Sequence, residues 1–126
     1  KDGKKMILGI GIDIVEVERI KKIVNRNVRI VDKILTVNEK KQWLQCDSEK
    51  RKIEFLAGRF AAKEAFSKAM GTGIGKLGFH DIEVQTNVHG APTISSESTM
   101  DNVFVSISHS DLYAVSQVII EQLCKE

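Results

Sequence analysis

Apolar residues recur at helical spacing through most of the first half of the chain. A spacing of three to four residues places apolar side chains on one face of a helix. The pattern predicts four helical segments: one with Val17, Ile20 and Val24, one with Val28, Val31 and Leu35, one with Trp43 and Leu44, and one from about Glu49 to Met70.

Two of these segments carry boundary signals. Thr36 to Glu39 (TVNE) fits a capping box, in which Thr and Glu side chains bond each other's backbone N–H groups at a helix start. Gly71 stands where a glycine commonly ends a helix. Residues 71–78 (GTGIGKLG) then form a flexible connector.

Strand patterns occupy the second half and the beginning of the chain. Residues 7–13 (ILGIGID) are apolar and end in a carboxylate, which indicates a buried strand. Apolar residues alternate from about residue 79 onward, with a turn at 90–92 and a hairpin loop at 108–112. We expect an α+β fold in which helices of the first half pack on an antiparallel sheet from the second half. Residues 1–126 form one domain, and residues 1–5 are interpreted as an expression remnant.

The composition is that of an ordinary soluble globular domain. The 126 residues are 42% apolar and 29% charged, and their formal net charge is +2. This charge is too small to favour a nucleic-acid binder. The apolar runs are shorter than the roughly 18 residues that cross a bilayer. The two cysteines lack the spacing of a metal site and are interpreted as inert thiols. We expect a cytoplasmic protein without a membrane partner.

The first candidate site is Asp13, at the end of the expected strand. Gly9 and Gly11 precede it, but the third glycine of a dinucleotide fingerprint is missing. Asp13 is either the N-cap of the next helix or a ligand for Mg²⁺, which binds one or two carboxylates together with phosphate oxygens.

The second candidate lies in the long helix, at residues 59–68 (RFAAKEAFSK). Helical spacing brings Glu64, Ser67 and Lys68 together, with Lys63 beside them and Arg59 one turn before. The stretch is either a solvated charged face or a phosphate site, in which cations neutralise phosphate oxygens and the carboxylate holds Mg²⁺.

Two further stretches allow two interpretations each. His109, in residues 106–110 (SISHS), is either a surface turn residue or a phosphate ligand or base. The basic residues between Arg19 and Arg29 either keep the surface soluble or dock an acidic partner. His80 and His89 have no supporting neighbours in the sequence and are interpreted as structural.

Together these stretches resemble the holo-acyl-carrier-protein synthase family of 4'-phosphopantetheinyl transferases. The family pattern opens with G-I-G-x-D-I and an arginine six residues after the aspartate. It continues with R-F-A-x-K-E-A-F-S-K-A-x-G-T-G and ends with S-x-S-H. This chain reads GIGIDIVEVER, GRFAAKEAFSKAMGTG and VSISHS in the same order, so the resemblance covers almost its whole length.

The resemblance implies a reaction and a set of site residues. The family moves 4'-phosphopantetheine from coenzyme A to a serine of apo-acyl carrier protein, releases 3',5'-ADP, requires Mg²⁺, serves fatty acid biosynthesis and forms homotrimers. The implied metal ligands are Asp13 and Glu64, and the implied catalytic set is Glu64, Asp13 and Lys68. The residues implied to bind coenzyme A are Arg59, Lys63, Ser67, Lys68, Gly71, Pro92 and His109. The residues implied to bind the carrier, on the first helix, are Arg19, Arg26 and Arg29.

One departure from the family is visible at the 90–92 turn. Family members often read G-K-P there, and this chain has Ala91 in place of the lysine. A cation near the nucleotide is therefore missing, which weakens coenzyme affinity without changing the reaction. The competing hypotheses are a non-catalytic module that binds an acidic protein or a nucleotide through the basic helix, and a nucleic-acid binder.

Overall fold

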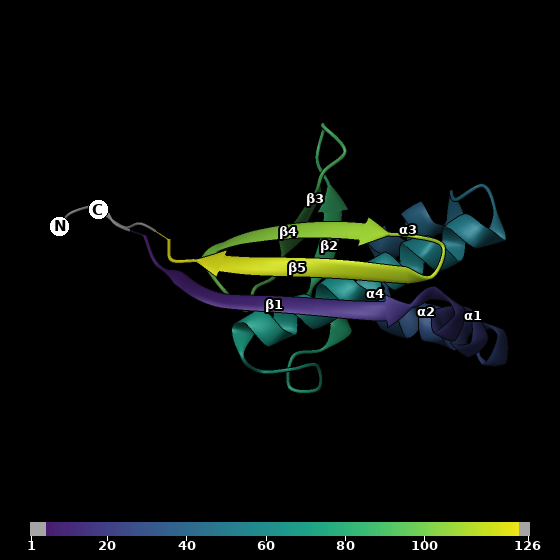
Figure 1. Cartoon of the computed structure of the whole chain (residues 1–126), viewed down its shortest axis with the longest axis horizontal. Helices are drawn as coiled ribbons and strands as arrows, with labels where there is room; N and C mark the ends of the chain where they lie inside the picture. Colours follow the sequence, from purple (N-terminus) through teal and green to yellow (C-terminus); the bar gives the residue numbers. More distant parts are fainter. Residues whose placement is uncertain (1–4, 124–126) are drawn as a thin grey trace.

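The computed structural model describes residues 5–123, and its helices lie behind a long antiparallel sheet (Figure 1). The elements in chain order are β1 (Ile7–Glu16), α1 (Val17–Arg26), α2 (Arg29–Ile34), α3 (Val37–Leu44), α4 (Glu49–Met70), the 3-10 helix η1 (Phe79–Asp81), β2 (Glu83–Thr86), β3 (Pro92–Ser95), β4 (Asn102–His109) and β5 (Tyr113–Glu121). No helix in this part of the chain is long and apolar enough to cross a bilayer.

The main sheet has three antiparallel strands in the order β1-β5-β4. The α+β class is therefore confirmed, but the sheet does not come from the second half alone, because β1 supplies one of its edges. β2 and β3 form a separate two-stranded sheet across the predicted turn. Gly90 adopts a positive φ of 83° in that turn, a conformation that side chains with a Cβ disfavour.

β1 is longer than its sequence pattern indicates. Its pairing with β5 continues past Asp13 to Glu16, which lies opposite Tyr113. The N-cap interpretation of Asp13 is therefore wrong: Asp13 lies within the strand opposite Ser116, and α1 begins four residues later. β4 likewise continues through His109, which shortens the predicted hairpin loop to residues 110–112.

Two glycines of β1 let α4 pack unusually close to the sheet. A Cβ at Gly9 would lie 1.9 Å from the carbonyl oxygen of Ala69, and a Cβ at Gly11 would lie 1.9 Å from that of Ala65. Any side chain at these positions would collide with backbone. Because alternate residues of a strand share a face, the same close approach brings Asp13 against α4.

The other face of β1 is open, so the predicted buried strand is buried only on its α4 side. Ile10, Ile12 and Ile14 are 60%, 58% and 63% exposed, respectively. On the far edge strand, Phe104 of β4 is 55% exposed. The register places these side chains on the sheet face opposite α4.

α4 is the central element of the core. Ser48 caps its start by accepting a hydrogen bond from the Arg51 N–H, and Gly71 ends it in the left-handed conformation with φ 79°. The predicted C-terminal glycine and the predicted helix span are both confirmed. Small residues such as Ala61, Ala62 and Ala65 are fully buried between the sheet and the shorter helices.

Candidate active site

Asp13 and Lys68 meet where α4 crosses β1. The Lys68 ammonium donates hydrogen bonds to the Ile12 carbonyl oxygen at 2.9 Å and to Asp13 Oδ1 at 3.1 Å. The Asp13 side chain is largely buried, whereas the Lys68 side chain is half exposed. The pair thus lies at the surface, with its cation open to an incoming anion.

Glu64 completes a group of two carboxylates and one cation. Partial burial raises the pKa of Glu64, the negative charge of Asp13 raises it further, and Lys68 opposes both effects. The two carboxylates are therefore close enough to repel each other, and one lysine does not fully compensate them. A pair of hard oxygen donors of this kind fits Mg²⁺ when substrate phosphates supply further ligands.

Ser67 lies beside this group, but its hydroxyl faces inward. The side chain is fully buried, and its Oγ donates to the Glu64 carbonyl oxygen at 2.8 Å. The predicted position near Glu64 is found. The hydroxyl hydrogen, however, is used in this hydrogen bond to the helix backbone, so Ser67 has a packing role beside Glu64 in this structure.

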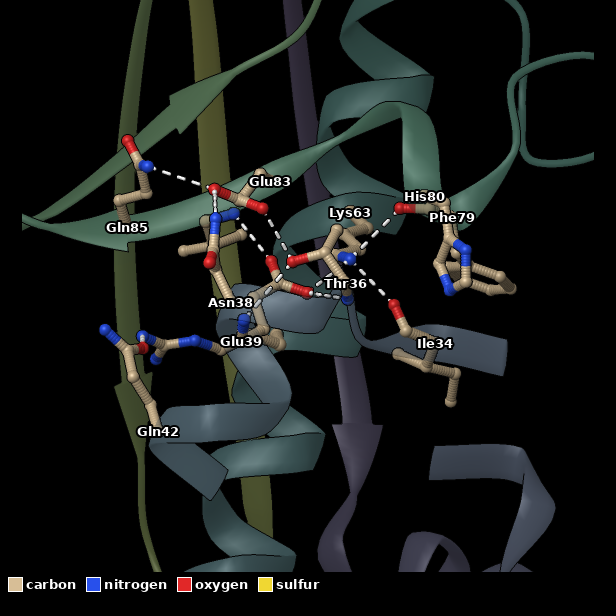
Figure 2. A network of polar contacts seen from close by, with 12 residues as sticks. Ile34, Thr36, Asn38, Glu39, Gln42, Lys63, Phe79, His80, Glu83 and Gln85 are labelled. Atoms are coloured by element: carbon tan, nitrogen blue, oxygen red, sulfur yellow. Dashed lines mark hydrogen bonds and ion pairs between the residues drawn. The ribbon is translucent and has the colours of Figure 1, made fainter. Parts of the chain in front are cut away.

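Lys63 occupies a different place from the one that the resemblance implies. Its side chain is fully buried, and the ammonium donates to Glu39 Oε1 at 2.7 Å and to the carbonyl oxygens of Ile34 and Phe79 at 2.7 and 3.0 Å (Figure 2). Three acceptors use its three donors and leave none for a pyrophosphate. Lys63 is therefore a structural residue here, and its assignment to coenzyme binding is corrected.

Glu39 is the acceptor around which this buried network is built. Its Oε1 also accepts the Thr36 N–H at 2.9 Å, which confirms the predicted capping box, and its Oε2 accepts the Val84 N–H at 2.6 Å. One carboxylate thus joins the start of α3, the middle of α4 and strand β2. The sequence pattern indicated only the helix-capping part of this role.

Glu83 extends the network to the surface (Figure 2). It accepts hydrogen bonds from the side chains of Thr36, Asn38 and Gln85. The Thr36 hydrogen bond makes the largest contribution to lowering the pKa of Glu83. The sequence patterns indicated Glu39 only through the capping box and did not indicate Glu83, because their other partners are distant in sequence.

Arg59 lines a pocket of about 520 Å³ together with Phe55, Thr86 and Gly90. Its guanidinium carbon lies 4.0 Å from the centre of the Phe55 ring, and one Nη donates to Thr86 Oγ1 at 3.5 Å. Among the described residues, its buried Nε has no hydrogen-bond partner. Burial is the main cause that lowers the pKa of Arg59.

Pro92 and Gly71 act through the backbone. Pro92 begins β3 and pairs with Thr86 of β2, next to the Arg59 pocket. Gly71 ends α4 one turn after Lys68, and its left-handed conformation turns the chain into the connector. Ala91 stands in the turn before Pro92, where its N–H donates to Asn87 Oδ1 at 3.0 Å.

His109 ends β4, and its described polar contact is with α4. Its Nδ1 lies 4.0 Å from Glu54 Oε2, and its side chain is 41% exposed. The structure joins His109 to Glu54, a residue that the sequence patterns did not single out. The local sequence feature that could have indicated Glu54 is its position one helical turn before Gly58 and Arg59.

The three arginines of the basic stretch are exposed but do not lie on one helix. Arg19 and Arg26 belong to α1, which ends at Arg26. Arg29 begins α2, and its N–H donates to Asn27 Oδ1 at 3.1 Å. The prediction that all three share the first helix is corrected: they span α1 and the start of α2.

The family model for the 4'-phosphopantetheinyl transferase superfamily matches residues 9–120. The chain belongs to this superfamily. The match includes all three motifs and confirms the resemblance seen in the sequence.

Holo-[acyl-carrier-protein] synthases match nearly the whole length of this chain. A holo-[acyl-carrier-protein] synthase of Geobacillus sp. (strain WCH70) is 56% identical over 119 residues, which are 94% of this chain and 99% of the relative. The corresponding protein of Enterococcus faecalis is 53% identical over 116 residues, 92% of this chain and 98% of the relative.

Solved structures agree in fold. The holo-(acyl-carrier-protein) synthase of Bacillus anthracis, in complex with CoA (3',5'-ADP), superposes with a TM-score of 0.87 at 48% identity and covers 94% of this chain and 99% of its own. The Helicobacter pylori enzyme in complex with coenzyme A has a TM-score of 0.78 at 35% identity, with 88% and 98% covered. The phosphopantetheinyl transferase fold is confirmed.

Proposed function

We propose that this chain is a magnesium-dependent holo-acyl-carrier-protein synthase. It transfers 4'-phosphopantetheine from coenzyme A to a serine of apo-acyl carrier protein and releases 3',5'-ADP. The observation that carries the proposal is the surface group of Asp13, Glu64 and Lys68, in a chain whose named relatives are synthases of this kind. The intact mass of the carrier after incubation with the protein, coenzyme A and Mg²⁺ tests it.

Asp13 and Glu64 would hold Mg²⁺, which supplies positive charge to the pyrophosphate oxygens of coenzyme A when it is bound. Lys68 adds a cation from the protein. Its ammonium is half exposed and bonded on one side to Asp13 and Ile12, which leaves a donor for the bridging oxygen on which charge grows as 3',5'-ADP leaves.

A base must take the proton of the attacking serine hydroxyl, and Glu64 is the candidate. A Glu64 oxygen that does not bind the metal could accept this proton when the serine hydroxyl lies within hydrogen-bond reach. The nucleotide end of coenzyme A would lie at Arg59 and against Pro92, with His109 at its 3'-phosphate. Ala91 offers no cation in the adjacent turn.

The carrier would bind across α1 and the start of α2. Arg19, Arg26 and Arg29 are exposed there and suit an acidic helix of the carrier.

Charge reversal at Arg26 (Arg26→Glu) should raise the KM for the carrier about tenfold and leave the KM for coenzyme A unchanged. Steady-state kinetics with each substrate varied in turn measures both, and Lys76→Glu in the exposed connector is the matched control. A larger change in the coenzyme KM than in the carrier KM would contradict the docking role.

The open apolar face of the sheet suits two further copies of this chain. Ile10, Ile12 and Ile14 lie exposed on it, and Phe104 is exposed on the same face. Burial of these side chains in a homotrimer would remove a large apolar area from water. The active site would then lie near a subunit boundary, since Ile12 precedes Asp13 directly.

Ile10→Lys should therefore convert the protein from a trimer into monomers. Sedimentation equilibrium should give about three times 14.1 kDa for the natural sequence and about 14.1 kDa for the variant. Val88→Lys is the matched control, because Val88 is also an exposed apolar residue but lies in the β2–β3 turn. A monomeric natural chain, or a variant that stays trimeric, would overturn the proposed assembly.

From this reaction we infer that the protein works in the cytoplasm, where coenzyme A and carrier proteins are both present. We also infer that it supplies active carrier for fatty acid biosynthesis. Both statements rest on the proposed activity. Neither depends on the assembly.

A further inference from the structure

The first two turns of α4 contain a carboxylate that the proposed reaction does not use. Glu54 is 6% exposed, and burial of a carboxylate requires partners that offset its lost hydration. Its Oε1 accepts a hydrogen bond from Arg51 at 3.2 Å, and its Oε2 lies 4.0 Å from both the Lys50 ammonium and His109 Nδ1. Glu54 thus joins α4 to the end of β4.

The loop that follows His109 is fixed on the same side. Lys50 of α4 also forms an ion pair with Asp111 at 3.2 Å, and the Ser110 N–H donates to the Tyr113 carbonyl oxygen at 2.8 Å. The Val17 N–H, at the start of α1, donates to the Leu112 carbonyl oxygen at 2.9 Å. With the backbone held in this way, the main freedom left to His109 is the rotation of its ring.

We propose that Glu54 is a positioning residue that orients the His109 ring and holds it ready to donate to an anionic group of coenzyme A. A carboxylate that faces Nδ1 selects the ring orientation in which Nε2 lies on the opposite side. A protonated ring can form an ion pair with Glu54 on its Nδ1 side, at 4.0 Å, and donate a hydrogen bond from Nε2 to a phosphate oxygen. This inference rests on the proposed function, which puts the 3'-phosphate of coenzyme A at His109.

The position of Glu54 along α4 separates this role from that of Lys68. Glu54 and Lys68 are fourteen positions apart on α4, almost four turns and about 20 Å along the helix axis. The 3'-phosphate and the reacting phosphate of one coenzyme A lie closer together than that, so the His109 that serves a given site would come from a neighbouring copy in the proposed homotrimer. Glu54 acts through that His109 on the nucleotide end, and its loss should weaken coenzyme binding without slowing the transfer step itself.

Glu54→Gln keeps the side-chain shape and removes the charge. It should raise the KM for coenzyme A and the Kd for 3',5'-ADP about fivefold to tenfold, with kcat and the carrier KM unchanged. With dephospho-coenzyme A, which lacks the 3'-phosphate, the variant and the natural sequence should give the same KM. Glu49→Gln, an exposed glutamate of the same helix, is the matched control and should change neither value.

A double-mutant cycle with His109→Gln separates positioning from a general structural role. If Glu54 acts through His109, then Glu54→Gln should add no further loss in the His109→Gln background. Should Glu54→Gln fail to fold, Glu54→Asp keeps the negative charge but draws it back from His109 by one methylene, and it should give the same coenzyme-specific loss.

The inference would be overturned by additive losses in the cycle or by an equal loss with dephospho-coenzyme A. If His109→Gln itself leaves the KM for coenzyme A unchanged, the inference also fails. In each of these cases the natural sequence still transfers phosphopantetheine, so the proposed function stands. Failure of the natural sequence to modify the carrier is a separate result that counts against the proposed function instead.

Discussion

Glu64→Gln should reduce phosphopantetheine transfer at least about 100-fold while the protein stays folded. Glutamine keeps the size of the side chain but removes the charge that would hold Mg²⁺ beside Asp13. The same variant should lose the rise in melting temperature that Mg²⁺ gives the natural sequence in the presence of 3',5'-ADP, because a ligand that binds only the folded state stabilises it. Thermal unfolding with and without the metal measures this independently of activity.

The pH dependence of the metal-free protein gives a second check on Glu64. Its pKa is raised in the folded state, so folding favours the protonated carboxyl. The contribution of Glu64 is therefore most favourable at acid pH and is lost as the pH rises from the ordinary glutamate range through the raised value. Relative to the natural sequence, metal-free Glu64→Gln should gain stability as the pH rises above the ordinary pKa of a glutamate. Glu97→Gln, an exposed control, should show no such trend. Near-normal activity of Glu64→Gln would remove the shared-metal model.

Lys63→Met should destabilise the fold by about 3–5 kcal/mol. The substitution leaves the buried Glu39 carboxylate without its cation and leaves the carbonyl oxygens of Ile34 and Phe79 without a donor. Burial lowers the pKa of Lys63 and the Glu39 charge opposes this, as expected for an ammonium held by its partner. Urea unfolding followed by circular dichroism gives the free energy of unfolding.

The matched control is Lys41→Met, on the exposed side of α3, which should change stability by less than about 0.5 kcal/mol. Lys63→Met that unfolds like the natural sequence but fails to bind coenzyme A would contradict the structural role. That result would restore the pyrophosphate contact implied by the family pattern.

Features that depend on neighbouring residues were predictable from the sequence. The Thr36–Glu39 capping box, the left-handed Gly71 and the span of α4 follow from local hydrogen bonding and helical periodicity, and all three are confirmed. Glu64 and Lys68 are four residues apart on this confirmed helix, so helical spacing also places both side chains on one face.

Features that depend on distant partners were not predictable in the same way. Lys63 was grouped with Lys68 by spacing, but its environment is set by Glu39, 24 positions earlier. Asp13 ends an apolar run in the sequence, yet pairing with β5 extends the strand beyond it. The alternation of glycine and isoleucine in residues 9–12 did hold a signal: one face admits the α4 backbone, and the other stays apolar and open.

The central claim is metal-dependent transfer, and the mass of the carrier tests it most directly. Purified protein, apo-acyl carrier protein, coenzyme A and Mg²⁺ should yield a carrier heavier by about 340 Da, one phosphopantetheine arm, and EDTA should prevent the gain. A carrier of unchanged mass, in a reaction where the protein is folded and the carrier is competent for a known synthase, would contradict the account. A non-catalytic binding module would then explain the basic surface better.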